Sequence, residues 1–100
     1  MPELPELNPV IHGKLRLALL SLLAAVEKGE FTWLREQTGA TDGNLGAQLL
    51  KLEEAGYLTV EKKFVERKSQ TTYRMTEAGR SALIEYVRAL KQLLGAAIGV

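Results

Sequence analysis

Three polar side chains recur at helical spacing near the middle of the chain. Asn44, Gln48 and Lys51 are four and three residues apart, so a helix would carry them on one face. Asparagine and glutamine can donate and accept hydrogen bonds together, which suits the major-groove edge of adenine, and lysine can reach guanine or phosphate. The small residues Gly43 and Ala47 beside them would allow close approach to a groove. This pattern predicts contact with double-stranded DNA, although a merely solvated polar face is the more common meaning of such a stripe.

The helix that would carry this face has clear signals at both ends. Gly39 permits the positive φ of a tight turn, and the Thr41 hydroxyl can cap the first free N–H groups of a helix. We therefore expect a recognition helix that begins at Asp42, with an acidic first turn, and stops at Gly56. Three leucines at i, i+4 and i+7 define its buried side: Leu45, Leu49 and Leu52.

The segments on both sides of the recognition helix predict a helix-turn-helix followed by a hairpin. Residues 31–37 are predicted as a short helix that Thr32 caps, and residues 38–40 as the turn. Residues 57–64 and 71–75 are rich in β-forming side chains and are predicted as two strands with a polar tip between them. The segment 61–74 holds five cations against two acids, a net charge of +3.

A basic hairpin beside a recognition helix predicts contacts with a phosphate backbone. Such tips are usually only solvated, but the neighbouring helix makes phosphate contact the preferred interpretation here. The hairpin residues predicted to make these contacts are Arg67, Lys68, Thr71 and Thr72, and Thr41 at the start of the recognition helix would assist them. The hairpin would position the protein while the helix reads the bases.

The start of the chain predicts an extended arm and then a long helix. Residues 1–8 form the arm, and the helix covers residues 10–28, with Asn8 as its cap and Pro9 at the first helical position. An interruption of this helix near Gly13 is the alternative to a continuous helix. From residue 15 to residue 26 this helix is apolar nearly all round, which means burial on more than one side. A domain of this size has little material to surround a helix, so a partner chain is one way to cover it.

The end of the chain predicts a second long helix, capped by Thr76 and running to Ile98. Its wide apolar stripe consists of Leu83, Val87, Leu90 and Leu94. Such a stripe exceeds what one neighbouring helix covers, so we predict the seam of a homodimer shared with the first helix. A helix packed only on its own domain is the alternative.

The length and composition of the chain restrict its chemistry. One hundred residues make a single domain, residues 1–100. The chain has no cysteine and a single histidine, His12, which excludes disulfides, zinc sites and thiolate metal sites. No nucleotide-binding or catalytic motif occurs, so we expect neither an enzyme nor a cofactor. The longest apolar run is too short for a bilayer, which needs about 20 residues, and the N-terminus does not resemble a signal peptide. We therefore expect a cytoplasmic protein that does not bind membranes.

Four segments of the sequence, taken together, resemble a known family. The order of helices and strands, over about residues 8–94, is similar to that of winged helix-turn-helix transcriptional regulators of the MarR and ArsR type, in their compact single-domain group. The segments that carry the resemblance are Arg16-Leu17-Ala18-Leu19-Leu20, Thr41-Asp42-Gly43-Asn44-Leu45, Leu49-Leu50-Lys51-Leu52-Glu53-Glu54-Ala55-Gly56-Tyr57-Leu58 and Thr71-Thr72-Tyr73-Arg74-Met75-Thr76-Glu77-Ala78-Gly79-Arg80. The chain departs from the family at Gly46, Gln48 and Glu66, where Ser, His and Gly are common.

The resemblance implies an α+β, mainly helical winged helix-turn-helix with a two- to three-stranded wing and a long C-terminal dimerisation helix. Such proteins bind operator DNA as homodimers, with half-sites about 34 Å apart. The expected function is therefore a sequence-specific, DNA-binding transcriptional regulator, with repression as the expected outcome. A protein-interaction module that does not read DNA is the alternative. A small-molecule effector, bound between the first and last helices of a dimer, stays open.

Overall fold

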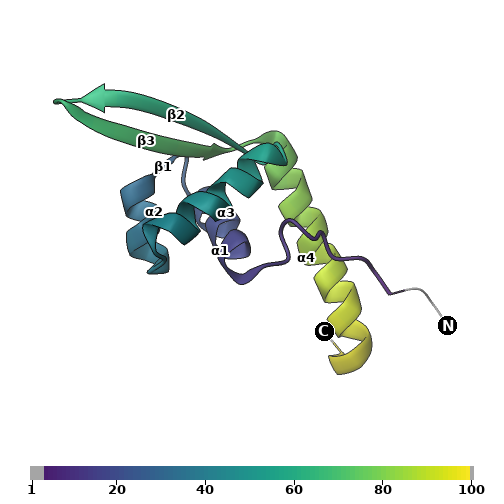
Figure 1. Cartoon of the computed structure of the whole chain (residues 1–100). Helices are drawn as coiled ribbons and strands as arrows, with labels where there is room; N and C mark the ends of the chain where they lie inside the picture. Colours follow the sequence, from purple (N-terminus) through teal and green to yellow (C-terminus); the bar gives the residue numbers. More distant parts are fainter. Residues whose placement is uncertain (1–3, 100) are drawn as a thin grey trace.

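Four helices and a three-stranded sheet make up the described part of the protein. In the computed structural model, which describes residues 4–99, the chain runs in the order α1 (Lys14–Ala25), β1 (Gly29–Glu30), α2 (Phe31–Thr38), α3 (Asp42–Glu54), β2 (Leu58–Val65), β3 (Lys68–Met75) and α4 (Glu77–Ile98). Figure 1 shows β2 and β3 extending together from the helices, while α4 extends from them in another direction. The predicted class, α+β and mainly helical with a small sheet and a long last helix, is confirmed.

The core lies where the first three helices meet the sheet. The leucine stripe predicted for α3 is confirmed, since its members are at most 1% exposed. Burying side chains of this size stabilises a fold by about 1.5–3 kcal/mol each. The buried residues around which the helices pack are Ile11, Leu19, Leu20, Leu23, Leu34, Leu45, Leu49, Leu52, Leu58, Tyr73 and Tyr86.

The predicted ends of α3 are confirmed by its capping contacts. The Thr41 Oγ1 atom accepts a hydrogen bond from the Asn44 backbone N–H at 3.3 Å, and α3 begins at Asp42. Gly39 and Gly56 both adopt positive φ angles, 69° and 82°. These angles carry a steric cost for other residues, which explains glycine at both positions.

The first helix is shorter than the sequence predicts. Asn8 caps a single turn instead of a helix, because its Oδ1 atom accepts hydrogen bonds from the N–H groups of Val10 and Ile11. The chain becomes extended at Gly13, and α1 begins only at Lys14. Residues 4–8 of the predicted arm lie outside helices and strands, and residues 1–3 lie outside the described part of the chain.

The second helix begins one residue before the predicted cap. Its N-cap is Glu30, because β1 ends there and the helix follows at once. Thr32 therefore lies inside the first turn, and the prediction that it caps α2 is wrong. The strand β1 pairs with β3 through Gly29 opposite Tyr73 and gives the sheet the order β1-β3-β2. Two residues carry too little pattern to be predicted from sequence.

The hairpin is longer and its turn tighter than the sequence predicts. β3 begins at Lys68, which pairs with Val65, so Glu66 and Arg67 alone form the turn. Their φ angles are 51° and 67°. Two positive φ angles are what a two-residue type I′ hairpin turn requires, and that turn suits the twist of the strands it joins. Neither residue is one that such a turn prefers.

We expect the Glu66→Asn variant to be more stable than the native protein. Asparagine tolerates a positive φ better than glutamate, so the free energy of unfolding should rise by about 0.5–1 kcal/mol. Urea denaturation followed by circular dichroism would measure this difference. The matched control is Glu66→Gln, which removes the same charge without the backbone preference and should leave stability unchanged; equal gains in both variants would contradict the explanation.

The last helix is fixed to the end of α3. The predicted cap is confirmed, because the Thr76 Oγ1 atom accepts from the Gly79 N–H at 3.0 Å. The same hydroxyl donates to the Gly56 carbonyl at 2.6 Å, and the Thr76 N–H donates to the Tyr57 carbonyl at 3.0 Å. Three hydrogen bonds therefore hold the first turn of α4, and two of them join it to the residues that end α3.

Within residues 4–99, every helix lacks either the length or the apolar character that a membrane crossing needs.

Candidate nucleic-acid interface

The outer face of α3 is open to solvent along its length. Gly43, Asn44, Ala47 and Lys51 are exposed, as predicted, and the leucines on the opposite side hold the helix against the core. Leu50, which the sequence analysis did not single out, is 53% exposed and widens this face. An exposed leucine on such a helix can contact the methyl group of thymine. The leucine pattern alone could have identified it, since Leu50 lies off the buried stripe.

Gln48 stands at the margin of this face and contacts the protein itself. Its side chain is half-buried, and its Oε1 atom accepts a hydrogen bond from Nη1 of Arg16 in α1 at 2.5 Å. Its Nε2 atom donates to Asn44 Oδ1 at 3.1 Å. The structure thus brings Asn44 and Gln48 together and adds Arg16, which lies 32 residues from Gln48 in the sequence and which no sequence pattern connected with it.

The four wing residues predicted to contact phosphate differ in exposure. Arg67 and Lys68 are exposed, and Thr71 is half-buried. Thr72 is only 8% exposed, because it lies in the central strand between Glu30 of β1 and Glu61 of β2. Little of its surface is open to a phosphate, and its contact with the backbone of DNA stays a prediction.

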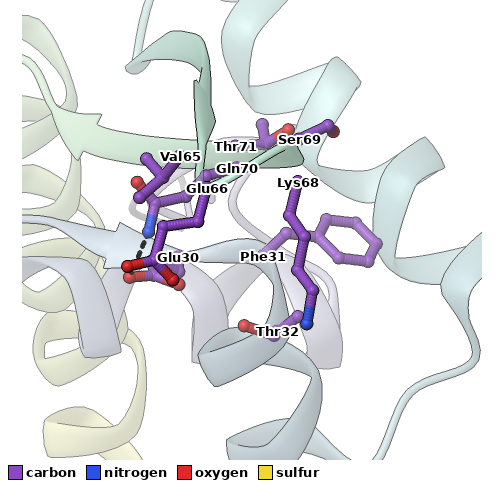
Figure 2. A pocket seen from close by; sticks show the side chains of 9 residues that line it. All are labelled: Glu30, Phe31, Thr32, Val65, Glu66, Lys68, Ser69, Gln70 and Thr71. Carbon is purple, nitrogen blue, oxygen red and sulfur yellow. Dashed lines mark hydrogen bonds between the residues drawn. The ribbon is translucent and has the colours of Figure 1, made fainter.

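A hollow of about 410 Å³ separates the wing from the start of α2. Figure 2 shows its nine lining side chains and the hydrogen bond from Gln70 Nε2 to Glu30 Oε1, which is 2.9 Å long. The lining includes both Glu66 and Lys68, so its charge is mixed. The cations that a phosphate backbone could meet therefore lie toward the tip of the wing.

Ion pairs neutralise some of the cations near this surface. Arg35 Nη1 lies 2.8 Å from Asp42 Oδ1, and that hydrogen bond, with the attraction of the carboxylate, raises the pKa of Arg35. Lys63 Nζ lies 2.9 Å from Glu61 Oε1 and lowers the pKa of the Glu61 carboxyl. Within residues 4–99, Lys51, Lys62, Arg67 and Lys68 form no ion pair, so their charges are available to a partner.

The apolar stripe predicted for α4 is divided between two surroundings. Leu83 and Leu90 are half-buried against the core of their own chain. Val87 and Leu94 are each 41% exposed, and Ile84 at 47% and Ile98 at 66% extend the exposed part. On this helix the buried aromatic residue is Tyr86, whose hydroxyl lies 2.8 Å from His12 Nδ1 in the N-terminal segment.

An apolar groove of about 700 Å³ lies beside the N-terminus of α3. It lies between α1 and the turn that joins α2 to α3, away from the boundary of the first and last helices that the sequence leaves open for an effector in a dimer. Its lining consists of Lys14, Leu15, Ala18, Ser21, Leu22, Gln37, Thr38, Ala40 and Asn44. In the part of the chain that the structure describes, no three His, Asp or Glu side chains gather as metal ligands would.

Comparisons with known proteins agree with this geometry. The profile of a family described as the winged helix DNA-binding domain matches residues 15–94. An uncharacterized protein from Methanocaldococcus jannaschii is 34% identical over 84 residues, which cover 84% of this chain and 91% of that protein. A transcriptional regulator from Mycobacterium tuberculosis is 35% identical over 72 residues, which cover 67% of each.

Solved structures share the fold as well. The chain superimposes on a transcriptional regulator homologue from Pyrococcus horikoshii with a TM-score of 0.82, covering 89% of this chain and 88% of that one. Their sequences are 21% identical, so this likeness shows the fold alone.

Proposed function

Because the chain belongs to the winged helix DNA-binding domain family, we propose that it regulates transcription as a homodimer, with α3 in the major groove and the wing on the phosphate backbone. The coarser part of this statement, a DNA-binding transcriptional regulator, follows from the family and its relatives. The resemblance to winged helix-turn-helix regulators is thus confirmed, and the family is one of DNA-binding proteins and not of enzymes. Action at operators as a repressor, in the cytoplasm, belongs to the proposal.

The observation that carries the proposal is the exposed face of α3. Gly43 and Ala47 are small residues, so the backbone of α3 is accessible there, and the exposed side chains of Asn44 and Lys51 lie beside them. Entry into the major groove of DNA, which is about 12 Å wide, requires such an accessible helix surface with hydrogen-bonding side chains beside it. The unpaired cations of the wing, Arg67 and Lys68, would then meet phosphates next to that groove.

The exposed part of the α4 stripe supports the homodimer. Large apolar side chains at four positions of one helix are left open to solvent in a single chain, namely Ile84, Val87, Leu94 and Ile98. A second copy would cover them with an identical surface, as two-fold symmetry requires. Two recognition helices related by that symmetry would occupy half-sites about 34 Å apart. A small-molecule effector stays a prediction.

Retention on DNA at graded salt concentration tests the function. The native protein should bind random duplex DNA in low salt and elute as salt rises, because non-specific binding depends on phosphate contacts. A protein that passes through the column at every salt concentration would overturn the proposal and favour the alternative, an interaction module that does not read DNA.

The Lys68→Ala variant should bind every DNA sequence more weakly. Because Lys68 is expected to contact phosphate and not bases, the slope of log affinity against log salt should fall by about one unit. Fluorescence anisotropy at several salt concentrations would measure the slope. The matched control is Lys63→Ala, since Lys63 is already paired with Glu61 and its removal should change the slope less. Weaker binding to one cognate sequence only would contradict the phosphate contact.

A further inference from the structure

A guanidinium from α1 reaches the recognition helix. Arg16 Nη1 donates to Gln48 Oε1 at 2.5 Å, and this contact is partly buried. Two further contacts of Arg16 hold the guanidinium in place, because Nε donates to the Val10 carbonyl and Nη2 to the Pro9 carbonyl at 3.4 Å. The single turn that Asn8 caps therefore serves as the support for a cation that faces α3.

This contact fixes the direction of two amide groups. A guanidinium has five N–H donors and no acceptor, so Gln48 must turn its oxygen toward Arg16 and its nitrogen away. The Gln48 Nε2 atom then donates to Asn44 Oδ1, at 3.1 Å. Both amide oxygens are therefore engaged within the protein. The Asn44 Nδ2 atom and the second N–H of Gln48 remain to meet a partner.

We infer that Arg16 is a positioning residue that determines base specificity, because its contact with Gln48 makes α3 present N–H donors. Donors select the acceptor edges of guanine, N7 and O6, and of thymine, O4. Adenine offers one acceptor and one donor, so its recognition by a single amide needs an oxygen directed at the base, whereas both amide oxygens here are directed at donors within the protein. This inference rests on the proposed function, and it reverses the preference for adenine that the residue types alone suggest.

The space beside Arg16 points to the same role. A Cβ atom at position 13 would lie 2.7 Å from Arg16 Nη2, so the guanidinium occupies room that only glycine leaves. The φ angle of Gly13 is −163°, an extended conformation that any residue adopts. A side chain at this position would therefore displace the Arg16 guanidinium while the chain keeps its positive charge.

Selection of bound duplexes from a random pool tests the inference. The native protein should enrich guanine or thymine at the positions that Asn44 and Gln48 contact. In Arg16→Met, Gln48 is free to turn, so adenine at those positions should gain about tenfold, the size of one good base contact. The matched control is Arg35→Met, which removes an equal charge from the Asp42 ion pair and should leave the preference unchanged. A native preference for adenine, or identical preferences in native protein and Arg16→Met, would overturn the inference and leave DNA binding intact.

A second variant and a second readout guard against misfolding and against loss of charge. Gly13→Val keeps Arg16 and should shift the preference toward adenine as Arg16→Met does; an unchanged preference would count against the inference. Without DNA, the side-chain amide resonances of Gln48 should move in both variants but not in Arg35→Met, and resonances that stay fixed would overturn the contact. Failure of the native protein to bind any duplex would instead overturn the proposed function, and with it the inference about base specificity.

Discussion

Replacing Gly79 with alanine is expected to lower the free energy of unfolding by about 2–3 kcal/mol, the range of severe overpacking. The added Cβ atom would lie 2.4 Å from the Tyr57 carbonyl oxygen, and backbone atoms cannot move aside as the end of a side chain can. Relief would require separating α4 from the end of α3, at the cost of hydrogen bonds from Thr76 to Gly56 and Tyr57. Thermal unfolding should show the midpoint falling by about 10 °C or more, given about 4–8 °C for each kcal/mol in a domain of this size.

The matched control is Gly46→Ala, in the middle of α3. A Cβ atom there would have no neighbour within 4 Å. Alanine forms helices more readily than glycine, so this variant should gain up to about 1 kcal/mol. Destabilisation by both substitutions, or by neither, would contradict the close approach of Gly79 to Tyr57 as the cause.

Replacing Leu94 with aspartate is expected to convert a dimer into monomers. Leu94 is 41% exposed, so the charge should cost little in the single chain but should be buried and unpaired in the proposed seam. Leu90 is a poorer choice, because it packs against the core of its own chain. Sedimentation equilibrium would measure the mass. Affinity for an operator with two half-sites should fall by about 100-fold or more, because two linked sites no longer bind together.

The control for this charge is Gln92→Asp. Gln92 is exposed on the polar side of α4, so the variant should remain a dimer and bind DNA nearly as the native protein does. A dimer that persists in Leu94→Asp would place the seam elsewhere. A monomeric native protein would contradict the homodimer itself.

Local signals made the helix-turn-helix predictable. Thr41 and Thr76 cap helices in the structure because a hydroxyl three residues before a backbone N–H forms a contact within one turn. The leucine stripe of α3 is buried because helical periodicity places Leu45, Leu49 and Leu52 on one side. In each case the information lies within a few neighbouring residues.

What could not be predicted lies where distant segments meet. The burial of Thr72 could not be predicted, because it depends on pairing with β1, which is only two residues long. The true start of β3 at Lys68 depends on pairing with β2, which overrides the weak strand preference of the polar residues there. The Arg16 contact with Gln48 joins two helices, so the residue types on α3 alone could not predict it.

In the proposed dimer, the hydrogen bonds from Thr76 to Gly56 and Tyr57 would make α4 act as a lever on α3. With 22 residues, α4 is about 33 Å long, and the recognition helix is attached rigidly at its N-terminal end. If the α4 helices of two chains cross near Leu94 and Ile98, a change of about 5° in their crossing angle moves each α3 by about 3 Å over that length. The fit to an operator would then depend on the angle of pairing as much as on the side chains that touch the bases.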